Sequence, residues 1–92
     1  MNAQALVARN LRRLRVQRGW SQEALAFDAG VDRTYVSRLE RALENPSIGV
    51  LERLAEALDA EIVEFFAKPK AGEAPLKPLP GGRRKAQGRS GR

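Results

Sequence analysis

The chain has 92 residues, which is enough for one small domain. It contains no cysteine and no histidine, which excludes a disulfide framework, thiolate or imidazole metal ligands, and the commonest general base. No apolar run approaches the ~20 residues that a membrane-spanning helix needs, and the N-terminus lacks the apolar block of a secretory signal. We therefore expect a cytoplasmic protein with no membrane contact, no metal, no cofactor and no small-molecule ligand.

The net charge of +6 is unevenly distributed along the chain. Residues 68–92 hold eight Lys and Arg against one acid, and residues 1–41 hold eight Arg against four acids. Residues 42–67 hold one Arg against six acids. A basic half beside an acidic half is typical of a domain that binds a polyanion with one of its faces.

The first two predicted helices are bounded by clear start and stop signals. Apolar residues recur at helical spacing in the first, which should end at Gly19: Leu6, Val7, Leu11 and Leu14. Ser21 is a suitable cap for a second helix from Gln22 to about Ala29, which Gly30 should end.

Three further helices are expected before residue 68. Asp32 should cap a third helix, from Arg33 to about Arg41, and Asn45-Pro46-Ser47 combines a stop with a new cap. The fourth helix should bury one apolar face: Ile48, Leu51, Leu54, Ala55 and Leu58. After a short turn at Asp59-Ala60, a last helix is predicted over 61–67, with Ile62, Phe65 and Phe66 apolar.

Residues 68–92 differ in character from the domain at 1–67. They hold all but one of the five prolines, and their few apolar residues follow no pattern. Such a segment cannot offset the entropy of ordering. We predict a disordered basic tail that tracks DNA phosphates without sequence preference; a solubilising extension is the alternative.

The most informative segment is QEALAFDAGVDRTYVSRL, residues 22–39. Two helices that meet at a steep angle need a small residue at their closest approach, where Ala26 lies, and a turn residue that tolerates positive φ, such as Gly30. Buried contacts between the pair require apolar residues at four positions: Leu25, Val31, Val36 and Leu39. All six positions agree with a helix-turn-helix.

With this motif, the sequence resembles the Cro/repressor-like helix-turn-helix regulators over about 6–66. The matching segments are LRRLRVQRGWSQEALA, AGVDRTYVSRLER and NPSIGVLERLAEALD. The resemblance implies an all-α, five-helix DNA-binding domain that reads double-stranded DNA in the major groove. The chain departs from the family at two positions. The family usually has glycine at the position of Ala42 and often at that of Asp59; only local loop geometry is affected.

One arc of the third helix carries polar side chains. At 100° per residue, five residues share this arc, which we call the reading face: Arg33, Thr34, Ser37, Arg38 and Arg41. Arginine can bridge guanine O6 and N7, and Thr or Ser can bond base edges or phosphates; an ordinary solvated helix face is the alternative. The resemblance places base contacts at Arg33, Thr34, Ser37 and Arg38, and we expect a phosphate contact from Arg41.

Three more residues are candidates for phosphate contacts. Gln22 opens the second helix, where backbone amides favour an anion, and the resemblance implies a phosphate clamp there. The Tyr35 ring should pack at the domain edge while its hydroxyl reaches a phosphate, and Asn45 lies in the following loop. The resemblance also implies a structural ion pair between Arg15 and Glu40.

We expect no catalysis from this chain. The carboxylate pairs Glu52/Glu56 and Glu61/Glu64 lack a concave, partly dry site that would separate their pKa values, and are expected on a solvated face. The predicted function is a sequence-specific transcriptional regulator that binds a palindromic operator as a homodimer. The dimer surface is predicted at Val63, Phe65 and Phe66; the alternative is that the Phe residues simply close the core. The alternative function is an antitoxin-like protein-interaction module that also binds DNA.

Overall fold

The computed structural model describes residues 1–69 and confirms the all-α prediction. Its elements in chain order are α1 (Ala3–Gln17), α2 (Gln22–Ala29), α3 (Arg33–Glu40), α4 (Ile48–Ala57) and the 3₁₀ helix η1 (Ile62–Phe66). The fifth predicted helix is therefore a short 3₁₀ helix. Apart from Lys68 and Pro69, which are exposed, the predicted tail lies outside the described residues.

Each α-helix begins at a side-chain cap. Ser21 Oγ accepts a hydrogen bond from the Ala24 amide at 3.0 Å, and Asp32 Oδ2 accepts one from the Thr34 amide at 2.8 Å. Ser47 and Asn2 cap α4 and α1 in the same way. The three caps predicted from sequence, Ser21, Asp32 and Ser47, are confirmed, because a cap depends only on residues within one turn.

Each α-helix also ends in the same backbone motif, in which a residue with positive φ turns the chain. The four residues are Gly19 (φ 73°), Gly30 (φ 73°), Ala42 (φ 61°) and Asp59 (φ 54°). At the end of α3, the Leu43 amide donates to the Arg38 carbonyl at 2.9 Å and the Ala42 amide to that of Leu39 at 3.1 Å. These two bonds define a Schellman ending, which satisfies carbonyls that the helix leaves unpaired.

Ala42 is the strained member of this set, because an L-residue without a polar side chain is disfavoured at positive φ. Ala42→Gly should therefore raise the free energy of unfolding by about 0.5–1 kcal/mol. Urea denaturation followed by circular dichroism measures the change. The matched control is Ala24→Gly within α2, which should lower stability by about 1 kcal/mol. Destabilisation of similar size by both variants would contradict the strain at Ala42.

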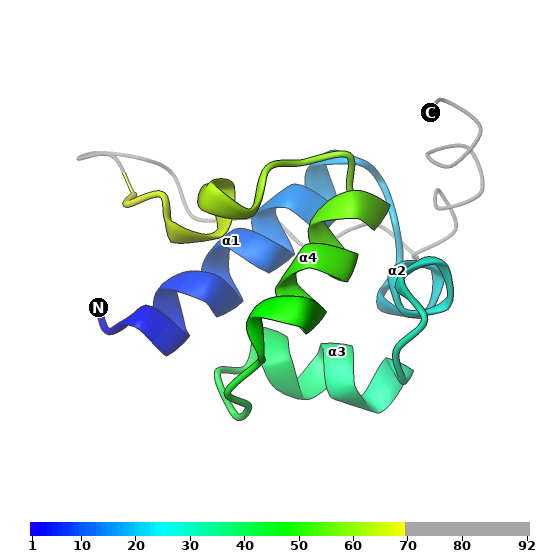
Figure 1. Cartoon of the computed structure of the whole chain (residues 1–92), viewed down its shortest axis with the longest axis horizontal. Helices are drawn as coiled ribbons and strands as arrows, with labels where there is room; N and C mark the ends of the chain where they lie inside the picture. The colour runs from blue at the N-terminus through cyan, green and yellow to red at the C-terminus, as the bar shows by residue number, and fades with distance from the viewer. Residues whose placement is uncertain (70–92) are drawn as a thin grey trace.

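The helices enclose one apolar core (Figure 1). Trp20, Leu25, Leu54, Leu58 and Phe65 are fully buried. The prediction that Ile48 lies in the core is wrong, since its side chain is 66% exposed. Ile48 is the first residue of α4, so periodicity places it on the apolar side of the helix without guaranteeing that another element covers it. Phe65 closes the core, which corrects its predicted place in a dimer surface.

Asn10 is a buried polar residue that joins η1 to α1. Its Nδ2 donates to the carbonyls of Phe65 at 2.9 Å, Ala67 at 2.8 Å and Leu6 at 3.1 Å. Its Oδ1 accepts a hydrogen bond from Arg13 Nε at 3.1 Å. A fully buried amide is stable only when its donors and acceptor are satisfied, and here they are.

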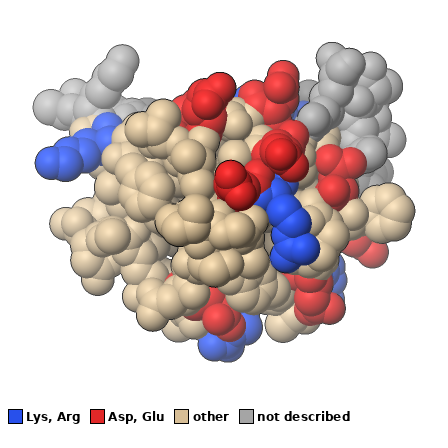
Figure 2. All heavy atoms as spheres, in the orientation of Figure 1, with Lys and Arg blue, Asp and Glu red and all other residues tan. Residues whose placement is uncertain are grey.

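Acidic side chains gather on one face of the domain. Figure 2 shows acidic side chains gathered on the face that carries α4. Glu52, Glu56 and Asp59 on and after this helix are exposed.

In the described part of the chain, no helix is both long and apolar enough to cross a bilayer.

Candidate nucleic-acid interface

The reading face lies on α3 as the helical periodicity predicts. Val36 and Leu39 are buried and anchor the opposite side of the helix, and Tyr35 packs against the core with its ring half-buried. Within the reading face, Arg33, Thr34 and Arg41 are exposed, and Ser37 and Arg38 are half-buried. No other side chain among residues 1–69 holds Arg33 by a hydrogen bond or ion pair. Its guanidinium is available to a ligand.

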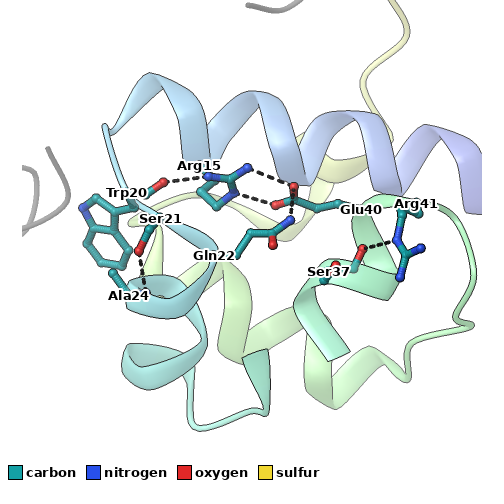
Figure 3. A network of polar contacts seen from close by, with 8 residues as sticks. All are labelled: Arg15, Trp20, Ser21, Gln22, Ala24, Ser37, Glu40 and Arg41. Carbon is teal, nitrogen blue, oxygen red and sulfur yellow. Dashed lines mark hydrogen bonds and ion pairs between the residues drawn. The ribbon is translucent and has the colours of Figure 1, made fainter. Parts of the chain in front are cut away.

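A buried ion pair supports the reading face from behind, and it confirms the pairing expected for Arg15 and Glu40. Arg15 Nε lies 2.6 Å from Glu40 Oε2, and its Nη2 lies 3.0 Å from Oε1, so the two groups meet in a bidentate geometry (Figure 3). Arg15 Nη1 also donates to the Trp20 carbonyl at 2.7 Å. The pair thereby fixes the end of α3 to α1 and to the start of the α2 segment.

Gln22 belongs to the same network. Its Nε2 donates to Glu40 Oε1 at 3.1 Å (Figure 3). Because a primary amide has two hydrogens, one N–H remains for a phosphate oxygen. Gln22 opens α2, with Ser21 as the cap, so the side chain also lies at the positive end of a helix dipole. The expected phosphate clamp is compatible with this position.

Arg38 is held by a partner that the sequence did not indicate. Its Nε lies 2.7 Å from Glu44 Oε2, and its Nη2 donates to the Leu43 carbonyl at 3.2 Å. The ion pair is partly solvated, with 43% of the Arg38 side chain and 30% of the Glu44 side chain exposed. Such a pair contributes only about 0–1 kcal/mol, so Arg38 can be released at low cost.

The structure separates the remaining candidates. Burial raises the pKa of the Tyr35 phenol, and the carboxylate of Glu44 raises it further, so the hydroxyl remains protonated and can donate. Asn45 is exposed in the loop after α3. Arg41 Nε donates to the Ser37 carbonyl at 3.4 Å, a long contact that leaves most of the guanidinium open. Arg41 and Asn45 therefore follow the end of α3, Tyr35 lies in its first turn, and Gln22 reaches its last residue, Glu40, from α2.

The acidic residues do not assemble into a site. Within residues 1–69, no three carboxylates are grouped so that they could hold a metal ion. Glu64 instead caps η1, since its Oε2 accepts a hydrogen bond from the Glu61 amide at 2.9 Å.

Comparison with known proteins gives concordant matches. The helix-turn-helix family model matches residues 11–65. A hypothetical transcription factor of Neisseria meningitidis serogroup B is 42% identical over 66 residues, which are 72% of this chain and 62% of the relative. The chain thus spans less than two thirds of the length of that relative. It spans 41% of a second relative, the HTH-type transcriptional regulator SlrR of Bacillus subtilis.

Solved structures agree with the sequence matches. The restriction-modification controller protein C.AhdI from Aeromonas hydrophila superposes with a TM-score of 0.66 at 45% identity, covering 67% of this chain and 94% of that one. The controller protein C.Esp1396I, solved as a tetramer on its natural 35 base-pair operator, superposes with a TM-score of 0.66 at 33% identity, covering 72% of this chain and 87% of that one.

Proposed function

This chain belongs to the Cro/C1-type helix-turn-helix family of DNA-binding transcriptional regulators, and from that premise we propose that it binds a palindromic operator as a homodimer. In this proposal α3 enters the major groove and the reading face contacts base edges. The role requires no catalytic step. We expect the protein in the cytoplasm, together with the DNA that it regulates.

The single observation that carries the proposal is the exposed polar face of α3 on a rigid support. Arg33 and Thr34 project from the start of the helix, where a recognition helix contacts bases. The buried Arg15–Glu40 pair and the buried Val36 and Leu39 hold the orientation of the helix. A recognition helix that is already held in its binding orientation loses less entropy when it docks in the groove.

The remaining contacts follow from the positions of the side chains. Thr34 and Ser37 are assigned to base edges or phosphates, and Arg38 to a base after it releases Glu44. Arg41, the last residue of the reading face, and Gln22, Tyr35 and Asn45 outside it are assigned to backbone phosphates. Phosphate contacts set the register of the protein on the duplex, and base contacts provide the sequence preference.

The proposed dimer surface is the exposed part of η1. Val63 is 68% exposed and Phe66 is 40% exposed, so two neighbouring apolar side chains face solvent. The multimeric C.Esp1396I controller on its operator is a precedent for oligomeric binding in a relative. Two half-sites one helical turn apart, about 34 Å, would multiply the specificity of a single short helix.

Selection from a library of random duplexes tests the proposal. The full chain should enrich a sequence with two inverted half-sites whose centres are about 10 base pairs apart. Sedimentation at micromolar concentration should show a dimer, which Val63→Glu converts to a monomer. Phe27→Glu is the matched control, because Phe27 is 82% exposed on α2 and outside the proposed surface. Failure to enrich any sequence, or a monomer both free and on the selected duplex, would contradict the proposal.

A further inference from the structure

A groove runs between α1 and the end of α3, beside the reading face. Small side chains of Ala5, Ala8 and Ala42 line it together with the basic side chains of Arg9, Arg12 and Arg41. Its volume is about 480 Å³, and it is open to solvent. None of its basic residues from α1 belongs to the DNA-contacting set proposed above.

The groove carries an excess of positive charge. Its one acid, Glu40, is already bound by Arg15 at 2.6 Å and 3.0 Å and by Gln22 at 3.1 Å. The Arg12 side chain forms no hydrogen bond or ion pair with any other described residue, and the Arg41 side chain bonds only the Ser37 carbonyl. The guanidinium groups of Arg12 and Arg41 are therefore not neutralised by a neighbouring carboxylate within residues 1–69.

The position of the groove relates it to the proposed DNA contacts. Arg41 follows Ser37 by four residues, so it lies about 6 Å further along the helix axis than Ser37. The groove begins at Arg41 and continues onto α1, away from the start of α3 where base contacts are proposed. An anion in this groove would flank the reading face.

We propose that this groove binds a phosphodiester of the DNA backbone just outside the bases under α3, with Arg12 and Arg41 as donors and Arg9 at its edge. The inference rests on the proposed function and extends its footprint to α1. A guanidinium presents a planar fork of N–H donors that matches two phosphate oxygens, and the alanines leave room for a close approach. Arg9 also donates to Asn10 Oδ1 at 3.3 Å, so Arg12 is the cleaner residue to vary.

The test is the salt dependence of DNA affinity for the full chain and for Arg12→Ala. Each lost phosphate contact should lower the steepness of log K against log salt by about 0.9, hence by about 2 for a dimer with two grooves. Affinity for operator and for random duplex should fall alike, because a phosphate carries no sequence information. Arg12→Lys, which keeps the charge, should retain most of the slope.

Arg53→Ala is the matched control, since Arg53 is exposed on α4 and lines a separate pocket with Asp28 and Glu56. It should leave the slope unchanged. Equal slopes for the wild type, Arg12→Ala and Arg53→Ala, with operator preference intact in all three, would overturn the groove and leave the proposed function standing. A wild-type chain without salt-dependent affinity for duplex DNA would overturn both.

Titration with inorganic phosphate distinguishes a DNA phosphodiester from a free anion. Arginine Nε resonances followed by NMR should shift only at high millimolar phosphate, because a single anion lacks the neighbouring contacts of a duplex. Tight binding of inorganic phosphate that Arg12→Ala abolishes, together with an unchanged slope on DNA, would mean that the groove serves a free anion and that the proposal is wrong.

Discussion

Glu40→Ala should lower the free energy of unfolding by about 3–5 kcal/mol, because it leaves the Arg15 guanidinium buried without its counter-charge. The side chains of Arg15 and Glu40 are only 9% and 3% exposed, so water cannot replace the missing carboxylate. A small domain has a total stability of about 5–15 kcal/mol, so much of the fold is lost. Urea denaturation measures the change, and DNA affinity should fall with the folded fraction.

The chain offers a matched control in its second ion pair. Glu44→Ala removes the partner of Arg38, but these side chains are partly solvated, so the cost should be about 0–1 kcal/mol. Replacing both Arg15 and Glu40 with Met and Leu should recover part of the loss, since no uncompensated charge remains. Equal losses for Glu40→Ala and Glu44→Ala would show that burial does not determine the strength of these pairs.

Arg33→Ala should weaken binding to the selected operator by about 1–3 kcal/mol per half-site and change affinity for random duplex little. Arg33 is exposed, and no other side chain among residues 1–69 holds it, so its removal should not disturb the free protein. Gln22→Ala should weaken operator and random duplex to a similar extent, because it removes a phosphate contact. Competition binding with both duplexes measures the two effects.

Arg38→Ala separates two roles of that side chain. If Arg38 contacts a base, its removal should cost operator affinity, reduced by the ~0–1 kcal/mol needed to open the pair with Glu44. Glu44→Gln, which frees Arg38 without removing it, should then leave operator affinity unchanged or raise it. Equal losses on operator and random duplex for Arg33→Ala and Arg38→Ala would mean that the reading face has been assigned wrongly.

The parts of the fold that depend on neighbouring residues were predictable from sequence. The caps at Ser21, Asp32 and Ser47 and the positive φ of Gly30 are set within one helical turn, and the structure contains all four. The Arg15–Glu40 contact joins residues 25 positions apart. It was expected only because the chain resembles a family, since spacing alone cannot indicate which distant charges meet.

Other features needed the three-dimensional arrangement. Ile48 has the periodicity of a core residue, but burial also requires that another element cover the side chain, and Ile48 is 66% exposed. The attachment of Arg38 to Glu44 depends on how the loop after α3 folds back. Asn10 could have been found, because it lies at helical spacing among the buried Val7, Leu11 and Leu14, where a polar residue requires specific partners.

The hydrogen bonds of Asn10 have a practical consequence for protein engineering. Because its amide holds the carbonyls of Phe65 and Ala67, the backbone at position 67 is anchored to α1. In Figure 1, η1 lies on the side of α1 opposite α3. A fluorescent protein or affinity label joined directly after Ala67 would start from this far edge, away from the surface that α3 presents to a duplex but next to the proposed dimer surface on η1.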